Sequence, residues 1–278
     1  MTGVVCYGVW KAGRVLLVIR IVGKAQAPSR GSLHRPGFSL VELLVAITVI
    51  VLLIGIMIPA ISEVRSTTHR VICSSNVRQI GLGIAMYADD YEGLLPPSIF
   101  IDDADDSPSQ AMLETVRLRV ASDSALFSAY HQNSEGLALK AAEPRGVWDG
   151  LGLLFSGEYL NARGVFYCPA HRGDNRLADV GTSAWTNDRS DLLGNFQYRA
   201  QGPDGTDELW RIEPRGSVLV SDSLRPDDEL NHEDGANTLR ADLSVLWFDD
   251  AGDQLLSLSR SGDAGRAWNL LDHRARQR

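Results

Sequence analysis

The strongest constraint on the fold is a run of 21 residues, Phe38 to Ile58, that contains a single charged side chain, Glu42. About 20 consecutive apolar residues are enough for a helix to cross a bilayer. A cleaved secretory signal would have a shorter apolar core followed by a small-x-small cleavage site. This run is longer, and it leads into Pro59 without such a site. We therefore expect a transmembrane helix over residues 38–60.

Charge is distributed unevenly on the two sides of this run. Residues 1–37 contain six Lys or Arg and no acid, whereas the remaining 241 residues hold 21 basic and 35 acidic side chains, a net charge of −14. Because basic flanks stay on the cytoplasmic side, we predict a single-pass inner-membrane protein. Its N-terminus would be cytoplasmic and its C-terminal head periplasmic or extracellular. The acidic head argues against a nucleic-acid partner, which normally meets a basic face.

Glu42 is the residue that a plain signal anchor does not explain, although an anchor fits the hydropathy equally well. A carboxylate inside a membrane helix costs about 2.5 to 3.5 kcal/mol on insertion scales, so it is expected to have a functional partner. A partner of opposite charge is the physically reasonable one, because a charge in lipid is tolerated mainly when it is paired.

The segment Gly37-Phe-Ser-Leu-Val-Glu-Leu43 follows directly on the basic stretch. It resembles the leader site of type IV prepilins and of the pseudopilins of type II secretion. The resemblance implies that residues 1–37 are a leader, which is long for this class, and that a prepilin peptidase cuts after Gly37 and methylates the new amino group of Phe38. It also implies that Glu42 neutralises the amino-terminus of a neighbouring subunit during assembly. Pro59 lies where many pilins kink this helix, since proline lacks the N–H that an inner turn needs.

The helix is expected to continue beyond the membrane over residues 61–93 as an amphipathic stem. Apolar positions recur at three- and four-residue steps, which is typical of one helix face: Ile61, Val64, Val71, Cys73, Val77, Ile80, Ile84, Tyr87 and Tyr91. Gly93 and the pair Pro96-Pro97 supply a stop. The stem from Phe38 to Glu92 would be roughly 80 Å long.

Later segments are similar to pilin-like proteins of planctomycetes and relatives, which carry a C-terminal His-x9-Asp-Gly signature. The similar segments are Cys73–Pro96, Trp148–Pro169 and the stretch from His232 to Asp242, where Leu243 replaces the signature's glycine. The resemblance implies an α+β fold in which the long helix packs on an antiparallel β-sheet head, residues 94–258. Because leucine is poor at positive φ, we predict a distorted or lengthened turn at Ala241 to Ser244.

The head offers six strand candidates and one short helix, at Leu151 to Tyr159. A segment at 115–120 fits either type, and a capped helix start is expected at 106–110. The composition of residues 249–253 is typical of a hairpin turn. The tail, residues 259–278, is expected to be frayed apart from Trp268 to Leu271. The strand candidates are residues 165–167, 195–199, 217–221, 236–240, 245–248 and 254–258.

Cysteine and histidine give few signs of chemistry. Cys73 and Cys168 either form a disulfide, which an exported compartment permits, or are two separately buried thiols. No histidine pair has metal-ligand spacing. His232 and Asp242 are read as a hydrogen-bonded pair that braces a hairpin, or as part of a cation site. Carboxylates such as Asp222 and Asp234 could bind calcium, but their spacing fits no ligand loop. We therefore predict no metal and no cofactor.

These features predict a non-enzymatic structural subunit of a type IV pilus-like or type II secretion fibre. Its partners would be prepilin peptidase, the inner membrane, and other pilin-like subunits that it meets through the stem. The alternative is a membrane-anchored periplasmic binding module for glycan or protein, which needs an aromatic-lined cleft. A tethered hydrolase would need a nucleophile and a base that we cannot assemble from these residues. The possible cleft residues are Trp148, Trp185, Trp210 and Trp247.

Overall fold

The computed structural model describes residues 10–11, 14–15, 38–102, 115–121, 147–186, 190–222, 224, 231–232 and 234–275. The chain divides into two compact units, Met1–Ile56 and Met57–Arg278. In the first unit, β1 (Trp10–Lys11) and β2 (Arg14–Val15) pair antiparallel within the leader. The predicted helix start at 106–110 lies outside the described residues.

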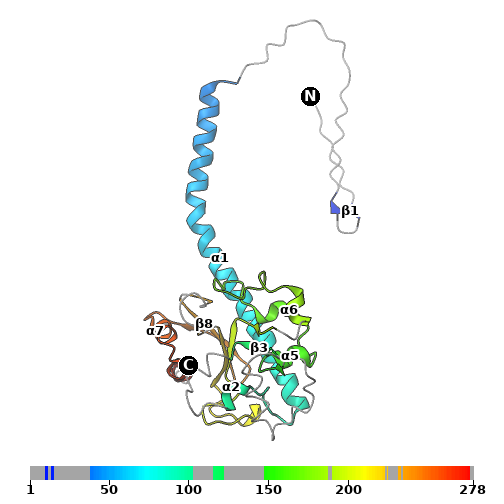
Figure 1. The fold of residues 1–278 in the computed structure, drawn as a ribbon. Coiled ribbons are helices and arrows are strands. Elements are labelled where there is room, and N and C mark those ends of the chain that lie inside the picture. Colours follow the sequence, from blue (N-terminus) through cyan, green and yellow to red (C-terminus); the bar gives the residue numbers. More distant parts are fainter. Residues whose placement is uncertain are drawn as a thin grey trace. The chain divides into compact units, whose positions relative to one another are not determined.

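The predicted long helix is confirmed as α1, Leu40–Asp90, 51 residues without interruption (Figure 1). It ends where expected, because Glu92 and Gly93 both take positive φ and the Gly93 N–H reaches back to Ala88 O at 2.7 Å. The buried stripe of α1 begins only at Cys73 and continues through Val77, Ile80, Ile84, Tyr87 and Ala88. The expected stripe is therefore only partly buried. Four of its positions are exposed: Ile61, Val64, Val71 and Tyr91.

Antiparallel sheets form the rest of the fold and confirm the α+β class. A four-stranded sheet has the order β6-β7-β8-β9, and a three-stranded sheet has the order β4-β3-β5. Four strand candidates and the undecided segment at 115–120 match observed strands. The strands are β3 (Arg117–Val120), β4 (Val147–Trp148), β5 (Leu192–Leu193), β6 (Phe196–Tyr198), β7 (Val218–Asp222), β8 (Gly235–Arg240) and β9 (Val245–Asp249).

The four-stranded sheet carries apolar side chains on both faces. One set, which includes Leu219 and Leu239, joins the buried stripe of α1 in the main core. The other set, which includes Val218 and Phe248, joins a second core with the C-terminal helices. α1 packs closely on β8 at Gly81, where an added Cβ would lie 2.6 Å from Leu239 Cδ1 and the leucine side chain would have to shift. The sheet therefore lies between two helical layers.

Helices replace two of the predicted strands. Residues 163–166 form the 3-10 helix η1 (Arg163–Phe166), and the predicted strand at 254–258 is the helix α7 (Gln254–Arg260). The reason for α7 is local, because both carboxylate oxygens of Asp250 accept backbone N–H groups at its start, those of Leu255 and Leu256, each at 3.0 Å. The remaining short helices are α2 (Ile99–Asp102), α5 (Gly152–Ser156), α6 (Thr182–Thr186) and η2 (Leu209–Arg211).

The expectation of a frayed tail is wrong, because residues 264–275 form the helix α8 (Ala264–Ala275). Its side chains Ala267, Trp268 and Leu271 are fully buried in the second core. Asp272 in the same helix pairs with Arg199, which directly follows β6, with 2.6 Å between the carboxylate and the guanidinium. The globular fold therefore extends to residue 275.

The lengthened turn between β8 and β9 is confirmed. The Leu243 N–H donates to Arg240 O at 2.9 Å, and the Arg240 N–H donates to Ser244 O at 3.0 Å. Leu243 has a φ of 65°. A three-residue turn of this kind needs one left-handed residue, where a two-residue turn of the Asn-Gly type needs two. Leu243 therefore occupies the left-handed position, where its Cβ makes the backbone conformation strained.

Candidate functional site

The residues predicted to serve in processing and assembly are Gly37, Phe38 and Glu42, of which Glu42 lies in the first turn of α1. Gly37 is outside the described residues, and Phe38 is exposed. The Glu42 carboxylate accepts the Ser39 backbone N–H at 2.9 Å, and the Ser39 hydroxyl accepts the Val41 N–H at 3.3 Å. The hydrogen bond from the Ser39 N–H to Glu42 is the one that a capping box makes. A capping box is a Ser-x-x-Glu arrangement that satisfies free N–H groups at a helix start. Glu42 therefore stabilises its own helix within one chain.

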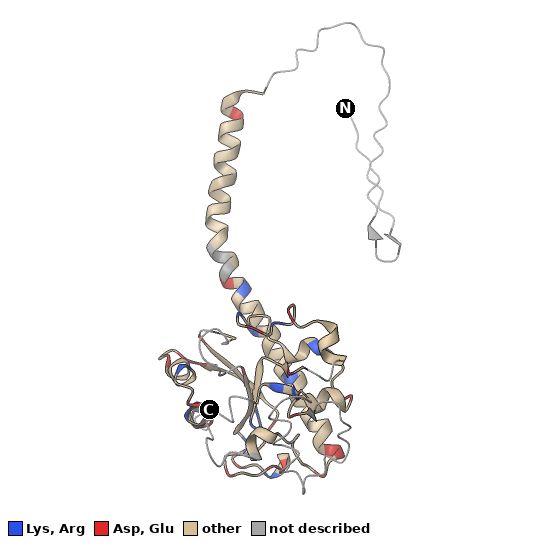
Figure 2. Cartoon of the chain, viewed as in Figure 1, with Lys and Arg blue, Asp and Glu red and all other residues tan. Residues whose placement is uncertain are grey.

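The first part of α1 presents apolar side chains all around its surface. From Leu43 to Ile58 it carries no charged residue (Figure 2), and its large apolar side chains are exposed. Among the described residues there is a single helix that is both long enough and apolar enough to cross a membrane, and it is α1. Pro59 lies inside α1 and does not end it. The kink at Pro59 stays a prediction.

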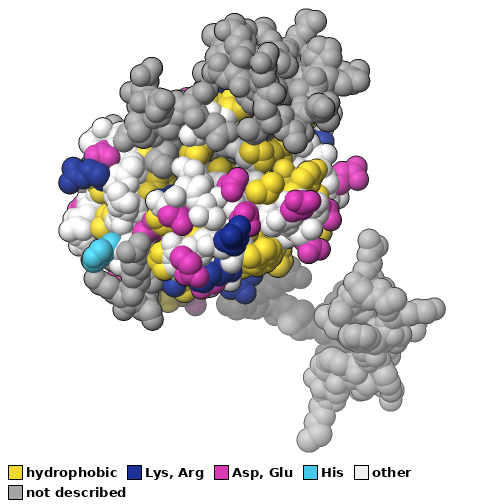
Figure 3. All heavy atoms as spheres, turned by 90° about the horizontal axis from the view of Figure 1, so that it is seen from below, with side chains coloured by type: hydrophobic (Ala, Val, Ile, Leu, Met, Phe, Trp, Pro, Cys, Tyr) yellow, Lys and Arg dark blue, Asp and Glu magenta, His cyan; other side chains and the backbone are white. Residues whose placement is uncertain are grey.

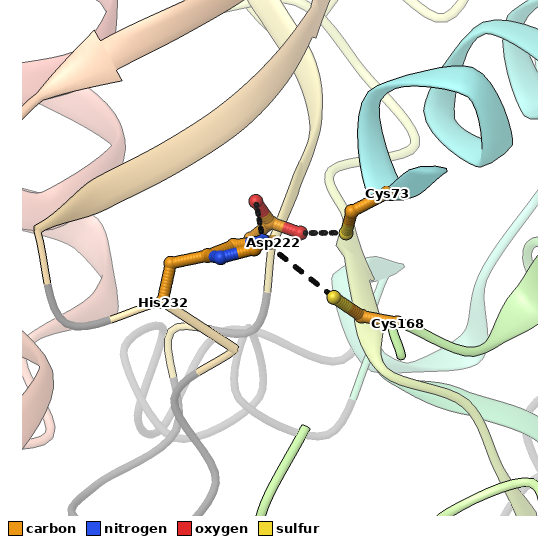
Figure 4. A group of neighbouring side chains, drawn as sticks. All are labelled: Cys73, Cys168, Asp222 and His232. Atoms are coloured by element: carbon orange, nitrogen blue, oxygen red, sulfur yellow. Dashed lines mark hydrogen bonds and ion pairs between the residues drawn. The ribbon is translucent and has the colours of Figure 1, made fainter. Parts of the chain in front are cut away.

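A second group of side chains meets inside the globular unit and forms what we call the donor cluster: Cys73, Cys168, Asp222 and His232. The members come from α1, from the segment after η1, from the end of β7 and from the residues before β8. Figure 4 shows them converging on one point. Their sulfur, nitrogen and oxygen atoms all lie within 4.8 Å of one another.

Three contacts fix the donor cluster. The Cys73 thiol donates to Asp222 Oδ1 at 2.8 Å. The Nε2 atom of His232 lies 3.6 Å from Cys168 Sγ and 3.7 Å from Asp222 Oδ2. The His232 and Asp222 side chains are only 6% and 2% exposed, and both cysteines are buried, so the cluster is largely shielded from bulk water.

Amide groups surround the Asp222 carboxylate. Asn237 donates to Oδ2 through its backbone N–H at 2.5 Å and through its side chain at 3.0 Å. The Asn231 side chain donates to Oδ1 at 3.2 Å, and its own carbonyl oxygen is 2.8 Å from His171 Nδ1. The sheet places Asn237 here, because β8 runs antiparallel beside β7 with Thr238 opposite Ser221. The carboxylate is thus held in one orientation.

Burial and mutual contact shift the ionisation of the donor cluster. Burial raises the pKa of the Cys73 thiol well above its ordinary value, and Cys168 and Asp222 add to the shift. Burial acts in the same direction on Cys168, but its hydrogen bonds with Cys73 and His232 lower the pKa of that thiol. Burial alone would lower the pKa of His232, yet Cys168 and the Asp222 charge raise it. Cys168 is therefore the thiol that ionises more readily.

Two predictions about these residues are revised. Cys73 and Cys168 are neighbours, as a disulfide would require, but both are free thiols in this structure. The predicted pair of His232 with Asp242 is not found. The Asp242 carboxylate instead accepts from the backbone and the hydroxyl of Ser244 in the turn, at 2.9 and 2.5 Å. The carboxylate that faces His232 is Asp222, because the connection from β7 to β8 carries His232 back to the end of β7.

The tryptophans that would line a binding cleft are mostly used in packing. The rings of Trp148 and Trp185 lie 6.2 Å apart and pack with Phe155 in the main core. The guanidinium of Arg70 covers Trp247 at 3.5 Å from the ring centroid. On the face drawn in Figure 3, acidic and basic side chains are interspersed among apolar ones. These positions do not support the alternative of an aromatic-lined binding module.

Comparisons with known proteins assign the chain to a family. Residues 34–58 match the model of the prokaryotic N-terminal methylation motif. Residues 62–228, more than half of the chain, match the family described as a protein of unknown function (DUF1559). The chain belongs to the DUF1559 family. No curated protein and no solved structure matches it.

The two matches together show a DUF1559 protein that is pilin-like and carries a prepilin-type leader. The motif and the apolar part of α1 support anchoring in a membrane. The DUF1559 match contains Cys73, Cys168 and Asp222 but ends before His232. The donor cluster is therefore built partly from the region beyond the matched family segment.

The chemistry open to the donor cluster is that of thiol, imidazole and carboxylate groups facing a common point. This donor set is one that metal ions of intermediate softness prefer. Sequence reasoning named all four residues, Asp222 only as a possible calcium ligand, but did not bring them together at one site. The available signal was that His232 lies in the connection between two consecutive antiparallel strands, the first of which ends at Asp222. When two neighbouring strands are antiparallel, the second begins beside the end of the first, so residues just before β8 lie near the end of β7.

Proposed function

We propose that this chain is a structural, non-enzymatic subunit of a type IV pilus-like or type II secretion fibre, and that prepilin peptidase processes it. The observation that carries the proposal is the methylation motif at 34–58, followed at once by an exposed apolar helix with a single acid at its start. A motif of this class favours a structural role over an enzymatic one. The resemblance to the planctomycete pilin-like group supports the same role.

In this proposal, cleavage after Gly37 frees the amino group of Phe38, which is then methylated. The head lies in the periplasm or outside the cell, and the stem remains in the inner membrane until assembly. The Glu42 carboxylate of one subunit meets the Phe38 amine of the next. Pairing the two charges removes most of the cost of holding either of them in lipid.

Because Glu42 also stabilises the start of its own helix, the two roles must be separated. Glu42→Gln keeps an oxygen that can accept the Ser39 N–H but removes the charge. Ser39→Ala removes the hydroxyl half of the cap and keeps the charge. If charge pairing drives assembly, Glu42→Gln abolishes fibres and stem-to-stem crosslinks, while Ser39→Ala retains them. Equal loss in both variants would show that only the capping of α1 matters.

Processing has its own test. The full chain is expressed with and without a prepilin peptidase, extracted from the membrane and examined by mass spectrometry of its amino-terminus. We expect a methylated Phe38 when the peptidase is present, and an intact leader in a Gly37→Val control. An uncleaved leader in the unaltered chain with active peptidase would overturn the proposal. Both Glu42→Gln and Ser39→Ala should be cleaved normally, which separates processing from assembly.

A further inference from the structure

We propose that the donor cluster binds one divalent transition-metal ion, and that zinc is the best match to its ligand atoms. Two cysteine sulfurs, one imidazole nitrogen and one carboxylate oxygen are all common zinc ligands. Calcium and magnesium are bound by oxygen ligands and would leave the sulfurs unused. The site goes beyond the assembly role, since all four members lie in the unit Met57–Arg278 and none is in the processing motif.

Two of the separations between donor atoms are those of four ligands around one centre, and all four atoms lie within 4.8 Å of one another. Zinc lies about 2.0 to 2.3 Å from nitrogen, oxygen and sulfur ligands, so the donors of a tetrahedral site are about 3.3 to 3.8 Å apart. The His232 nitrogen is 3.6 Å from the Cys168 sulfur and 3.7 Å from an Asp222 oxygen. The remaining 2.8 Å contact, between Cys73 and Asp222, is a hydrogen bond whose proton would leave on binding.

The arrangement does not fit a catalytic triad of cysteine, histidine and aspartate. In a triad the acid holds one ring nitrogen of the histidine and the nucleophile uses the other. Here Cys168 and Asp222 both approach the same atom, Nε2 of His232. The cluster side chains are also largely buried, which does not suit a nucleophile that must reach a substrate. Four protein ligands in a closed site are typical of structural zinc.

The surroundings of Asp222 support the same conclusion. Metal-bound carboxylates are themselves hydrogen-bonded by outer groups that fix their orientation. Asn237 and Asn231 donate three hydrogen bonds to the two Asp222 oxygens. The donor cluster therefore has both a set of four ligand atoms and the outer groups that would hold the carboxylate toward an ion.

Binding would be balanced by proton release. The divalent ion replaces the protons of the Cys73 and Cys168 thiols, which leave to solvent, and no electron is transferred. The ion would join α1 to the end of β7 and to the segments that carry Cys168 and His232. A disulfide between the two cysteines would consume both sulfurs, so oxidation and metal binding exclude each other.

The test uses the full chain in detergent, reduced and freed of metal with a chelator. Cobalt is added first, because four-coordinate cobalt with thiolate ligands gives strong visible and charge-transfer absorption. We expect saturation at one ion per chain and loss of the spectrum when zinc is added. Absence of the spectrum, or a Cys73–Cys168 disulfide with no metal in protein isolated without reductant, would overturn the proposal.

Variants make the assignment specific. Cys168→Ser and His232→Gln should lose the four-coordinate spectrum, while Cys6→Ser in the leader and His273→Gln on α8 should keep it. Asn231→Ala removes one outer donor to Asp222 and should weaken binding about 10- to 100-fold. Circular dichroism of each metal-free variant checks that the fold is retained. A spectrum unchanged in folded His232→Gln would place the ion elsewhere and contradict the proposal.

Discussion

Asp272 offers the sharpest test of how the C-terminal helix is held. Its Oδ2 atom lies 2.6 Å from Arg199 Nη1, and its Oδ1 atom accepts the Val218 N–H at 2.8 Å. Both side chains of the ion pair are at most 7% exposed. Asp272→Ala leaves a buried guanidinium and a buried N–H without these partners. Breaking a buried pair in this way costs about 3 to 5 kcal/mol, which is roughly a hundredfold to several-thousandfold in the folding equilibrium.

The assay is urea unfolding of the full chain in detergent, followed by tryptophan fluorescence. Trp268 lies in the same helix and is 1% exposed, so the release of α8 would expose it and change its share of the emission. Arg266→Ala is the matched control, because Arg266 is 76% exposed and its pair with Asp263 is 3.8 Å long. Exposed pairs contribute about 0 to 1 kcal/mol. If Asp272→Ala shifted the free energy of unfolding no more than Arg266→Ala does, the argument for a docking ion pair would fail.

Two further predictions concern packing and pH. In Gly152→Ala the new Cβ would lie 1.8 Å from Leu118 O. We therefore expect the free energy of unfolding, measured by thermal unfolding, to fall by at least about 1 to 3 kcal/mol. The control Gly181→Ala, whose nearest contact is at 3.6 Å, should change it little. The Tyr159 phenol donates to Asp90 at 2.7 Å, and partial burial together with this bond raises its pKa to about 12. The protonated form is thus favoured in the folded state, so this stabilisation is present below about pH 10 and is lost as the pH rises through 12. The difference between the alkaline absorbance titrations of the unaltered chain and Tyr159→Phe should have its midpoint near the higher value, and a midpoint near the ordinary tyrosine value of about 10 would contradict it.

Features that depend on local sequence were predictable. The apolar run, the leader motif and the stop at Gly93 are short-range patterns, and they place α1 within three residues of its observed bounds. The strands β7, β8 and β9 were also predicted, from short segments between turn residues. At Leu243 the missing glycine of the signature predicted the lengthened turn, although the leucine still takes positive φ in it.

Features that depend on tertiary contacts were not predictable in the same way. The segment 254–258 has leucines that fit either a strand or a helix, and the Asp250 carboxylate decides for α7 by accepting two N–H groups. The α8 helix is held by Asp272, whose partner Arg199 is far away in the sequence. The donor cluster draws on four separate segments, so no spacing rule could detect it.

The continuity of α1 has a practical and evolutionary consequence. The helix that would be immersed in lipid at one end supplies, from Cys73 to Ala88, central packing of the soluble fold at the other. A water-soluble derivative must therefore be truncated on the N-terminal side of Cys73. A truncation beyond Cys73 would remove core side chains together with the apolar, membrane-spanning part of the helix. For the same reason, exchange of such heads between relatives by recombination is expected to carry the lower part of the helix with it.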